Sequence, residues 1–384
     1  MSMAFTHETL GQRVLFGTGA AAEHVAAELE RLGATRPMVI AAGPERPLAA
    51  TAGVEAALWW EEVVQHVPVE VAEKARTAAA EHDIDALISV GGGSTTGLAK
   101  AIALTTGIPI IAVPTTYAGS EATDVWGLTE DRTKTTGVDP RVLPVAVVYD
   151  AHLSASLPVG LSVASGLNGL AHCIDSLWAP RTDPINQAMA LEGARALNLA
   201  LRGIAADPED LTAREQALYG CYLAAVAFAS AGSGLHHKIC HVLGGTFELP
   251  HAQTHATVLP YVLALNAPAV PELAGRLATA LGHYARGEQE DPGTAMLHGL
   301  PVAEGNHPAA IAVTALGALH RAVGAPTRLA EYGFTAEGIP EATHRILAAA
   351  PASNPVAVTE DNITGLLTAA LTGATPALET LISH

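Results

Sequence analysis

The sequence is poor in aromatic, charged and basic residues, and each scarcity narrows the possible functions. Aromatic residues make up 4% and charged residues 15% of its 384 residues. Lysine and arginine number 20 against 38 aspartates and glutamates, which gives a net charge of −18. Because nucleic-acid phosphates are bound by basic surfaces, this balance argues against a nucleic-acid partner. Any anionic ligand must therefore be met by a local cluster of cationic or donor groups.

Cysteines and charge-free apolar segments are also few. The three cysteines form no paired pattern, as is typical of a protein in a reducing compartment. The N-terminal segment MSMAFTHETL lacks a basic region followed by an apolar run, so we expect no signal peptide and a cytoplasmic location. Residues 216–235 carry no charge and are long enough to span a bilayer, but their alanine, glycine and serine content favours a buried helix. No membrane partner is expected.

The first 150 residues alternate short apolar segments with helix-like segments. The predicted strands are residues 13–20, 37–43, 86–94, 108–116 and 146–150, and the helical patterns include residues 20–33, 69–82 and 94–105. Such alternation is typical of a parallel sheet covered by helices. After Asp150 only helical patterns follow. The sequence therefore predicts an α/β domain over residues 1–152 and an all-helical domain over residues 153–384, with a ligand site in the cleft between them.

A glycine-rich turn, GGGS at residues 91–94, joins a predicted strand to a predicted helix. Glycines let the backbone approach a pyrophosphate, and the helix start offers free N–H groups and a positive dipole end. A tight turn without a ligand is the alternative. A second turn, PTTYAGSEAT at residues 114–123, favours a nucleotide, because it supplies hydroxyl groups at the end of the next strand. An ordinary hairpin there, with Lys134 a solvated charge, is the other possibility.

Histidines are concentrated in one segment, and five of the 17 lie between residues 235 and 255. Upstream, Asn168 and His172 are four residues apart. An aspartate at position 168, with His172, His237 and His251, would make a convincing Zn²⁺ or Fe²⁺ site. The neutral amide of asparagine is a poor ligand for a divalent cation. The pattern indicates a metal-site scaffold whose chemistry has changed.

These segments together resemble the maleylacetate reductase branch of the iron-containing alcohol dehydrogenase superfamily. The resemblance runs from about residue 10 to residue 375 and is carried by GGGSTTGLAKAIAL, PTTYAGSEAT, KTTGVDPRVLP, SGLNGLAH, LHHKICHVLGGTFELPHAQTHA, GAPTRL and SNPVAVTEDNITGLLTAA. It implies a Rossmann-like N-terminal domain, an all-α C-terminal domain of the kind also found in dehydroquinate synthases, a nicotinamide cofactor and commonly a homodimer.

The resemblance also implies roles for individual residues. The cofactor positions fall on Gly92, Gly93, Ser94, Thr115, Thr116, Ser120 and Lys134. The aspartate that selects NAD over NADP in many members falls on Ala42, with Arg46 close by, so both NADH and NADPH stay open. The superfamily's metal ligands fall on Asn168, His172, His237 and His251. Maleylacetate reductases typically carry asparagine at the first of these positions and are held to work without a metal.

The implied reaction sends hydride to the C=C bond of maleylacetate, a small dicarboxylate, and gives 3-oxoadipate in aromatic compound degradation. We expect His172, His237 and His251 to line an anion-binding pocket, with His241 nearby on the helix face of His237. Asn168 would orient a carboxylate or a histidine ring. Glycines 244 and 245 are expected to end that helix.

Several assignments stay open at this point. Lys238 either binds the substrate and lowers the pKa of neighbouring histidines, or faces solvent. His236 and His255 are either part of the pocket or satisfied core residues. Asp124 and Asp175, near the predicted pocket, leave open a modified substrate, as in a biosynthetic pathway. The competing functions are a metal-dependent alcohol dehydrogenase, a lyase or cyclase of the dehydroquinate synthase type, and a non-catalytic nucleotide-binding protein.

Overall fold

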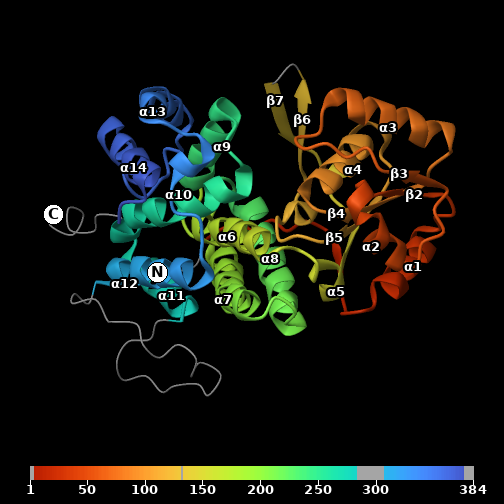
Figure 1. Ribbon diagram of the computed structural model, residues 1–384, viewed down its shortest axis with the longest axis horizontal. Helices are drawn as coiled ribbons and strands as arrows, with labels where there is room; N and C mark the ends of the chain where they lie inside the picture. The colour runs from red at the N-terminus through yellow and green to blue at the C-terminus, as the bar shows by residue number, and fades with distance from the viewer. Residues whose placement is uncertain (1–3, 131–132, 283–306, 376–384) are drawn as a thin grey trace. The chain divides into compact units, whose positions relative to one another are not determined.

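The computed structural model describes residues 4–130, 133–282 and 307–375, and the chain divides into two compact units (Figure 1). The sheet unit comprises residues 8–158 and 208–218, and the helical unit comprises residues 1–7, 159–207 and 219–384. The sequence placed one boundary at residue 152, whereas the units divide after Pro158. Residues 208–218 also belong to the sheet unit, which the sequence did not predict. Most of them form the first turns of α8 (Leu211–Ala231), and this helix continues without a break into the helical unit, so the sequence pattern shows no boundary there.

Six parallel strands form the sheet, in the order β1-β8-β5-β4-β2-β3. They are β1 (Arg13–Phe16), β2 (Pro37–Ile40), β3 (Leu58–Trp60), β4 (Ala86–Gly91), β5 (Ile110–Pro114) and β8 (Ala146–Tyr149). The five strands expected from the sequence are all present. The sixth, β3, has only three residues and is too short to show an alternating pattern.

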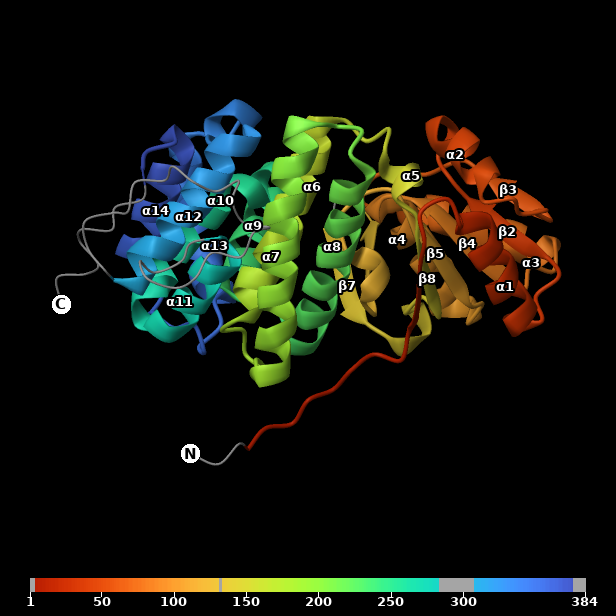
Figure 2. The ribbon, with the colours of Figure 1, turned by 90° about the horizontal axis from the view of Figure 1, so that it is seen from below.

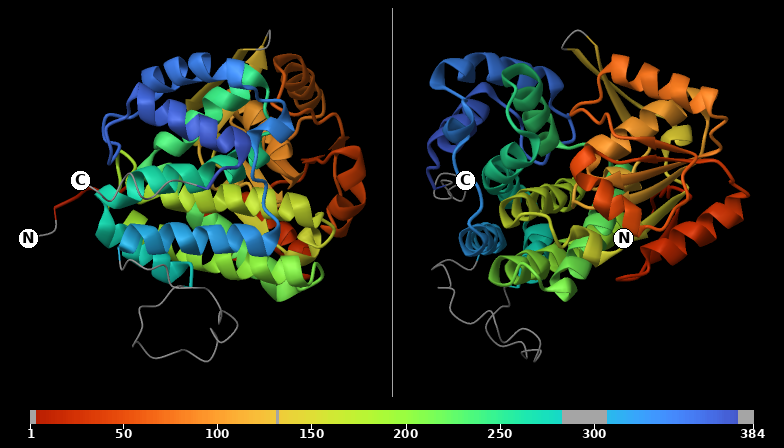
Figure 3. Two further views of the ribbon diagram at one scale, coloured as in Figure 1. Left: turned by 60° about the vertical axis from the view of Figure 1, so that its left-hand side comes forward. Right: turned by 45° about the vertical axis from the view of Figure 1, so that its right-hand side comes forward.

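Helices cover both faces of this sheet, as Figure 3 shows for α1 (Ala21–Leu32) and α3 (Val69–Glu81). Side chains alternate along a strand, so one strand serves both faces. Met38 on β2 packs in the same core as α3 and α4 (Gly93–Thr106), whereas its neighbour Val39 packs in the core that contains α1. The predicted α/β layering is therefore confirmed. Because these strands are buried on both faces, their sequences are continuous apolar runs.

The sheet unit also contains an antiparallel hairpin of β6 (Val125–Glu130) and β7 (Thr133–Val138). The sequence offered a hairpin only as the alternative to a cofactor role for this region. Lys134 lies on β7 opposite Thr129. Two short helices, α2 (Arg46–Thr51) and α5 (Ala151–Ser154), complete the regular elements before the helical unit.

The helical unit is built from long, alanine-rich helices (Figure 2). Besides residues 219–231 of α8, they are α6 (Val159–Ser176), α7 (Pro184–Ala206), α9 (Leu235–Phe247), α10 (His251–Asn266), α11 (Pro271–Ala280), α12 (Pro308–Val323), α13 (Ile339–Ala349) and α14 (Glu360–Thr372). The described residues after β8 contain no strand, as the sequence predicted.

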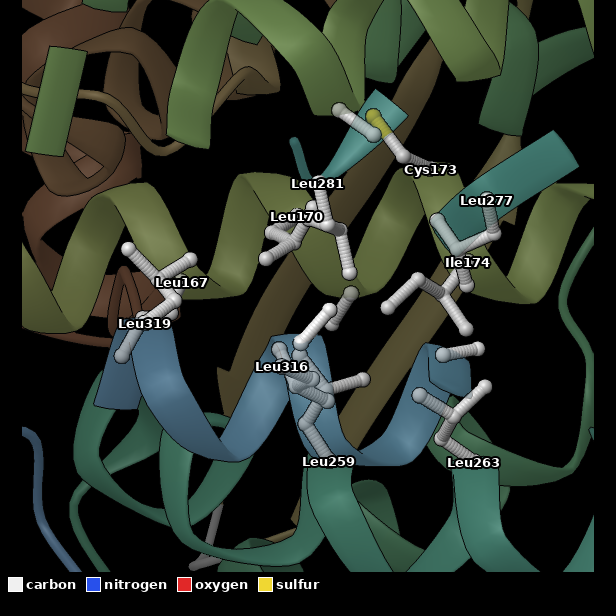
Figure 4. Close-up of a cluster of buried hydrophobic side chains, with 14 of the residues drawn as sticks. Leu167, Leu170, Cys173, Ile174, Leu259, Leu263, Leu277, Leu281, Leu316 and Leu319 are labelled. Atoms are coloured by element: carbon white, nitrogen blue, oxygen red, sulfur yellow. The ribbon is translucent and has the colours of Figure 1, made fainter. Parts of the chain in front are cut away.

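Two apolar cores hold this unit together. In the first, leucines of α6, α10, α11 and α12 point toward one another, as Figure 4 shows for Leu170, Leu259 and Leu316. In the second, α9 and α10 pack with α13 and α14. Small residues allow these helices to approach closely. A Cβ added at Gly193 of α7 would lie 3.1 Å from the carbonyl oxygen of Gly220 on α8.

The uncharged segment 216–235 is divided between α8 and α9, which begins after a break at residues 232–234. Within the described residues, no single helix combines the length and apolar character that crossing a membrane requires; α8 and α9 meet that criterion only as a pair, bent by 98°.

Candidate active site

The glycine-rich turn lies where β4 ends and α4 begins. Gly91 has φ +150°, and a Cβ added there would lie 2.5 Å from both Oε2 of Glu45 and Oγ1 of Thr95. Gly92 is the N-cap of α4, and no side chain caps that helix start. The first N–H groups of a 14-residue helix are therefore presented by bare backbone. This arrangement fits the pyrophosphate of a dinucleotide.

The second turn lies beside the first, because β5 pairs with β4. A Cβ added at Gly92 would lie 3.0 Å from Cγ2 of Thr116, and one added at Gly93 would lie 3.8 Å from Oγ of Ser120. That Ser120 hydroxyl is buried and has no hydrogen-bond partner among the described atoms. The structure thus brings together most of the predicted cofactor residues within the sheet unit. A buried hydroxyl of this kind is a group that a ligand can satisfy.

A buried lysine missed by the sequence reasoning holds the second turn in place. Nζ of Lys100, on α4, donates to the carbonyl oxygens of Ser120 at 2.6 Å, Thr123 at 2.8 Å and Val125 at 2.9 Å. Burial lowers the pKa of Lys100 to about 7. The signal was present in the sequence as a single lysine within the apolar helical run GLAKAIAL. Such a lysine requires several acceptors when it is buried.

In the helical unit, α6 positions Asn168 and His172 one turn apart, and both side chains are buried. The ring of His172 stacks 4.7 Å from Phe228 and 4.9 Å from His237. Oδ1 of Asn168, Nδ1 of His172 and Nε2 of His237 are buried without a hydrogen-bond partner among the described atoms. Unpaired buried polar atoms are costly, so their concentration marks a place where a polar ligand binds.

Asp175, three residues after His172 on α6, fixes the orientation of His237. Its Oδ2 lies 2.7 Å from Nδ1 of His237, and it also accepts a hydrogen bond from the N–H of Gly234 at 2.9 Å. Burial raises the pKa of Asp175 to about 7, against the hydrogen bonds that favour its charged form. The sequence left open that this carboxylate indicates a modified substrate. Its oxygens are instead directed to α9 and His237, as is typical of a group that orients a functional histidine.

His236 and His255 form a hydrogen-bonded pair, and their rings lie 5.3 Å and 4.9 Å from the ring of His237. Nε2 of His236 lies 3.0 Å from Nδ1 of His255, and Sγ of Cys240 lies 3.6 Å from the same Nε2. Both histidines are buried, and burial lowers the pKa of His236 to about 3. One nitrogen of each ring is paired in this way, whereas Nδ1 of His236 and Nε2 of His255 are buried without a hydrogen-bond partner among the described atoms, so the two histidines are only partly satisfied.

Three further predicted positions lie toward the surface. His241 is exposed with its ring 6.1 Å from that of His237, so the two histidines do lie near each other on α9. His251 is exposed at the start of α10, and its ring is 4.3 Å from that of His255. Lys238 is partly buried. Burial and neighbouring histidines lower the pKa of His237. The charge of Lys238 acts on Asp175, whose negative form it favours.

The helix α9 does not end at glycines 244 and 245, as the sequence predicted. It continues to Phe247, and the following residue, Glu248, adopts the left-handed conformation with φ +57°. Phe247 packs its ring 5.1 Å from that of Phe334. A glycine inside a helix costs only about 1 kcal/mol, and this tertiary packing outweighs that cost.

The four superfamily metal positions do not form a convergent metal-ligand set. Among the described His, Cys, Asp and Glu side chains, the only group of three whose ligand atoms all lie within 4.8 Å of one another is His236, Cys240 and His255. His172, His237 and His251 do not meet this distance, and Asn168 offers a neutral amide oxygen. The donor set therefore does not fit a divalent cation.

Comparison with known proteins identifies the family. Residues 11–151 match the sequence profile of iron-containing alcohol dehydrogenase, and residues 162–371 match that of the C-terminal part of the Fe-containing alcohol dehydrogenase family. The chain belongs to the iron-containing alcohol dehydrogenase family. It is similar to the solved structure of an iron-containing alcohol dehydrogenase from Corynebacterium glutamicum, with 55% identity, a TM-score of 0.90 and coverage of 98% of this chain and 99% of the other.

Maleylacetate reductases are also among its relatives. One from Sphingobium indicum is 44% identical, over 97% of this chain and 99% of the relative. The solved structure of another, from a Rhizobium species, is 40% identical, with a TM-score of 0.85 and coverage of 98% of this chain and all of the other. The fold class and the resemblance to maleylacetate reductases are thereby confirmed. The chain is an oxidoreductase that uses NAD(P)H.

Proposed function

We propose that this chain reduces the C=C bond of maleylacetate to give 3-oxoadipate, in the degradation of aromatic compounds, and does so without a metal. The relatives named maleylacetate reductase support the substrate. The observation that carries the proposal is the buried cluster of unpaired donors and acceptors at Asn168, His172 and His237, which contains no carboxylate directed at a ligand. Such a cluster suits an anionic substrate better than a cation.

The reaction sets clear demands on the site. Maleylacetate is a dicarboxylate whose C=C bond is conjugated to a ketone. NAD(P)H, when bound, supplies the hydride. Addition of hydride at the alkene carbon remote from the ketone breaks the π bond and places a pair of electrons on the ketone oxygen, as an enolate. One proton, added at the other alkene carbon, then restores the ketone and completes 3-oxoadipate.

The histidines of the helical unit meet the demand for enolate stabilisation and proton supply. His237 is the proton donor: Asp175 holds its Nδ1, so its buried and unpaired Nε2 is the atom left for the substrate. Burial and the neighbouring histidines lower the pKa of His237, so the carboxylate of Asp175 and the negative charge that develops on the substrate must together offset this effect for the ring to carry the proton it gives up. Burial lowers the pKa of His172 to about 4, so its ring stays neutral near pH 7 and acts as a hydrogen-bonding group.

A metal is not required for this step. In a metal-dependent alcohol dehydrogenase the Lewis acid polarises the carbonyl whose carbon the hydride attacks. In conjugate reduction the ketone already activates the alkene, and hydrogen-bond donors are enough to hold the developing charge. The buried, unpaired atom of Asn168 is Oδ1, and because the amide is neutral it does not repel an anionic substrate as an aspartate carboxylate would.

A substrate comparison with purified protein tests the proposal. Maleylacetate should cause stoichiometric loss of NADH or NADPH and the appearance of 3-oxoadipate, identified by mass spectrometry. 3-Oxoadipate itself, which keeps the ketone and lacks the alkene, is the matched control and should not be reduced. Reduction of simple aldehydes or of 3-oxoadipate, with no turnover of maleylacetate, would instead establish a carbonyl-reducing alcohol dehydrogenase.

The assembly and location follow from the same assignment. The enzyme acts as a homodimer on a small dicarboxylate in the cytoplasm, where its three free, buried cysteines stay reduced. Sedimentation analysis at working concentration measures the assembly, and a monomer would contradict this part of the proposal.

A further inference from the structure

The turn that follows β2 places a carboxylate against the glycine-rich turn. Glu45 ends the short segment between β2 and α2, and β2 pairs directly with β4. Oε2 of Glu45 lies 3.5 Å from Oγ1 of Thr95 and only 2.5 Å from where a Cβ at Gly91 would be. The carboxylate therefore covers the carboxyl end of β4 on the β2 side. Thr116 covers the same turn on the β5 side.

This placement has a consequence for a bound dinucleotide. When the pyrophosphate lies on a glycine turn of this kind, its two nucleosides extend to opposite sides, along the ends of the neighbouring strands. A carboxylate near the end of a neighbouring strand accepts hydrogen bonds from the ribose hydroxyls of NADH. The same carboxylate repels the 2′-phosphate that distinguishes NADPH.

Glu45 supplies the carboxylate that Ala42 lacks. From the sequence, the position that selects between the cofactors fell on Ala42, and no carboxylate was found there. The chain bends into a short 3₁₀ helix at residues 43–45, and this turn carries the side chain of Glu45 back over the strand ends. The group is half-buried, and charge–charge interactions are stronger there than at a fully solvated position.

Arg46, the residue considered as a 2′-phosphate ligand, is already engaged. Its guanidinium pairs with the carboxylate of Glu61 and lies 5.0 Å from the ring centroid of Trp59. Both contacts hold the arginine beside β3, the edge strand of the sheet. Binding a 2′-phosphate would require it to exchange an existing ion pair for a new one.

We propose that Glu45 makes this enzyme select NADH over NADPH. The inference rests on the use of a nicotinamide dinucleotide by the family and on the sheet unit alone, and it does not depend on the identity of the substrate. The sequence left open the choice between NADH and NADPH, and this inference decides it in favour of NADH.

The test measures cofactor binding without substrate. Dissociation constants for NADH and NADPH are obtained by fluorescence titration of the wild type, of Glu45→Gln and of Glu62→Gln. Glu62 is a matched control, because its carboxylate is exposed and pairs with Lys74. We expect the wild type to favour NADH by about tenfold or more, the size of one charge–charge interaction near a protein surface. Glu45→Gln should reduce that preference by about tenfold, and Glu62→Gln should keep it.

The outcomes separate this inference from the proposed function. Equal binding of the two cofactors by the wild type, tighter binding of NADPH, or an unchanged preference in Glu45→Gln would each overturn the role of Glu45. If Glu45→Gln fails to fold, the wild-type preference still decides, because a preference for NADPH contradicts the inference directly. A protein that prefers NADH but does not reduce maleylacetate leaves Glu45 in its role and removes only the substrate assignment.

Discussion

The carboxylate of Asp175 lies 2.7 Å from Nδ1 of His237, and both side chains are buried. The same carboxylate accepts a hydrogen bond from the N–H of Gly234, the N-cap of α9. A Cβ added at Gly234 would lie 2.3 Å from Oδ1 of Asp175, so this contact needs glycine. One aspartate thus sets both the start of the helix that carries His237 and the orientation of its ring.

Replacing Asp175 with asparagine should slow the reaction without weakening the binding of the cofactor. The amide keeps the size of the carboxylate and loses the charge that favours proton binding at His237, whose pKa burial already lowers. We expect kcat with maleylacetate to fall about 10- to 100-fold, as is usual when a group orienting a functional histidine is removed. Steady-state kinetics and an NADH titration measure the two effects. An unchanged kcat with an intact fold would show that His237 is not the proton donor.

Gly91→Ala should weaken NADH binding. Its φ of +150° is strained for any residue with a Cβ, and the new methyl group would contact Glu45 and Thr95. Strain of this kind costs about 1–3 kcal/mol, which corresponds to a rise of about 5- to 150-fold in the NADH dissociation constant if binding requires the strained turn. Gly11→Ala is the control, since a Cβ there contacts nothing within 4 Å. Equal affinity in both variants would contradict a cofactor role for this turn.

Lys100→Met should destabilise the sheet unit. It removes the donor that satisfies the carbonyl oxygens of Ser120, Thr123 and Val125 within the fold. Leaving buried acceptors unpaired costs about 1–3 kcal/mol for each group. Urea unfolding should therefore give a clearly lower midpoint than for the wild type. Lys74→Met, which removes an exposed pair with Glu62, should change the unfolding free energy by about 1 kcal/mol or less.

The buried histidines make stability fall with acidification. Burial lowers the pKa of His320 to about 4, below the ordinary value of 6.5. The unfolded chain therefore takes up a proton below pH 6.5 that the folded chain does not accept until about pH 4, and stability is lost across that window. From pH 7 to pH 5 this one residue contributes a loss of about 2 kcal/mol. His320→Leu should show a correspondingly smaller loss in urea unfolding at the two pH values. An identical loss in both proteins would show that His320 titrates normally.

The strand and helix pattern of the sheet unit could be predicted because each buried strand is a continuous apolar run ending in Gly, Thr or Asp. The sequence offered the hairpin β6–β7 only as an alternative and did not predict the short strand β3, since neither carries a long apolar pattern. The end of α9 was predicted wrongly because glycines 244 and 245 were given more weight than the packing of Phe247. That packing depends on Phe334, which is distant in sequence.

The candidate site was predictable in its residue types and only partly in its roles. The separation of His237 and His251 indicated a former metal scaffold, but spacing does not reveal which ring nitrogen is paired. The role of Asp175 required the three-dimensional approach of α6 to the start of α9. The role proposed for Glu45 could not be predicted from the strand-end position, Ala42, because it depends on the 3₁₀ turn at residues 43–45.

The most direct test of the account is turnover of maleylacetate by protein stripped of metal. The purified enzyme is treated exhaustively with EDTA, its residual iron and zinc are measured by elemental analysis, and NADH oxidation is followed with and without added Fe²⁺ or Zn²⁺. We expect full activity with metal far below one equivalent per chain and no gain on metal addition. Loss of activity on chelation, restored in proportion to metal bound, would contradict it.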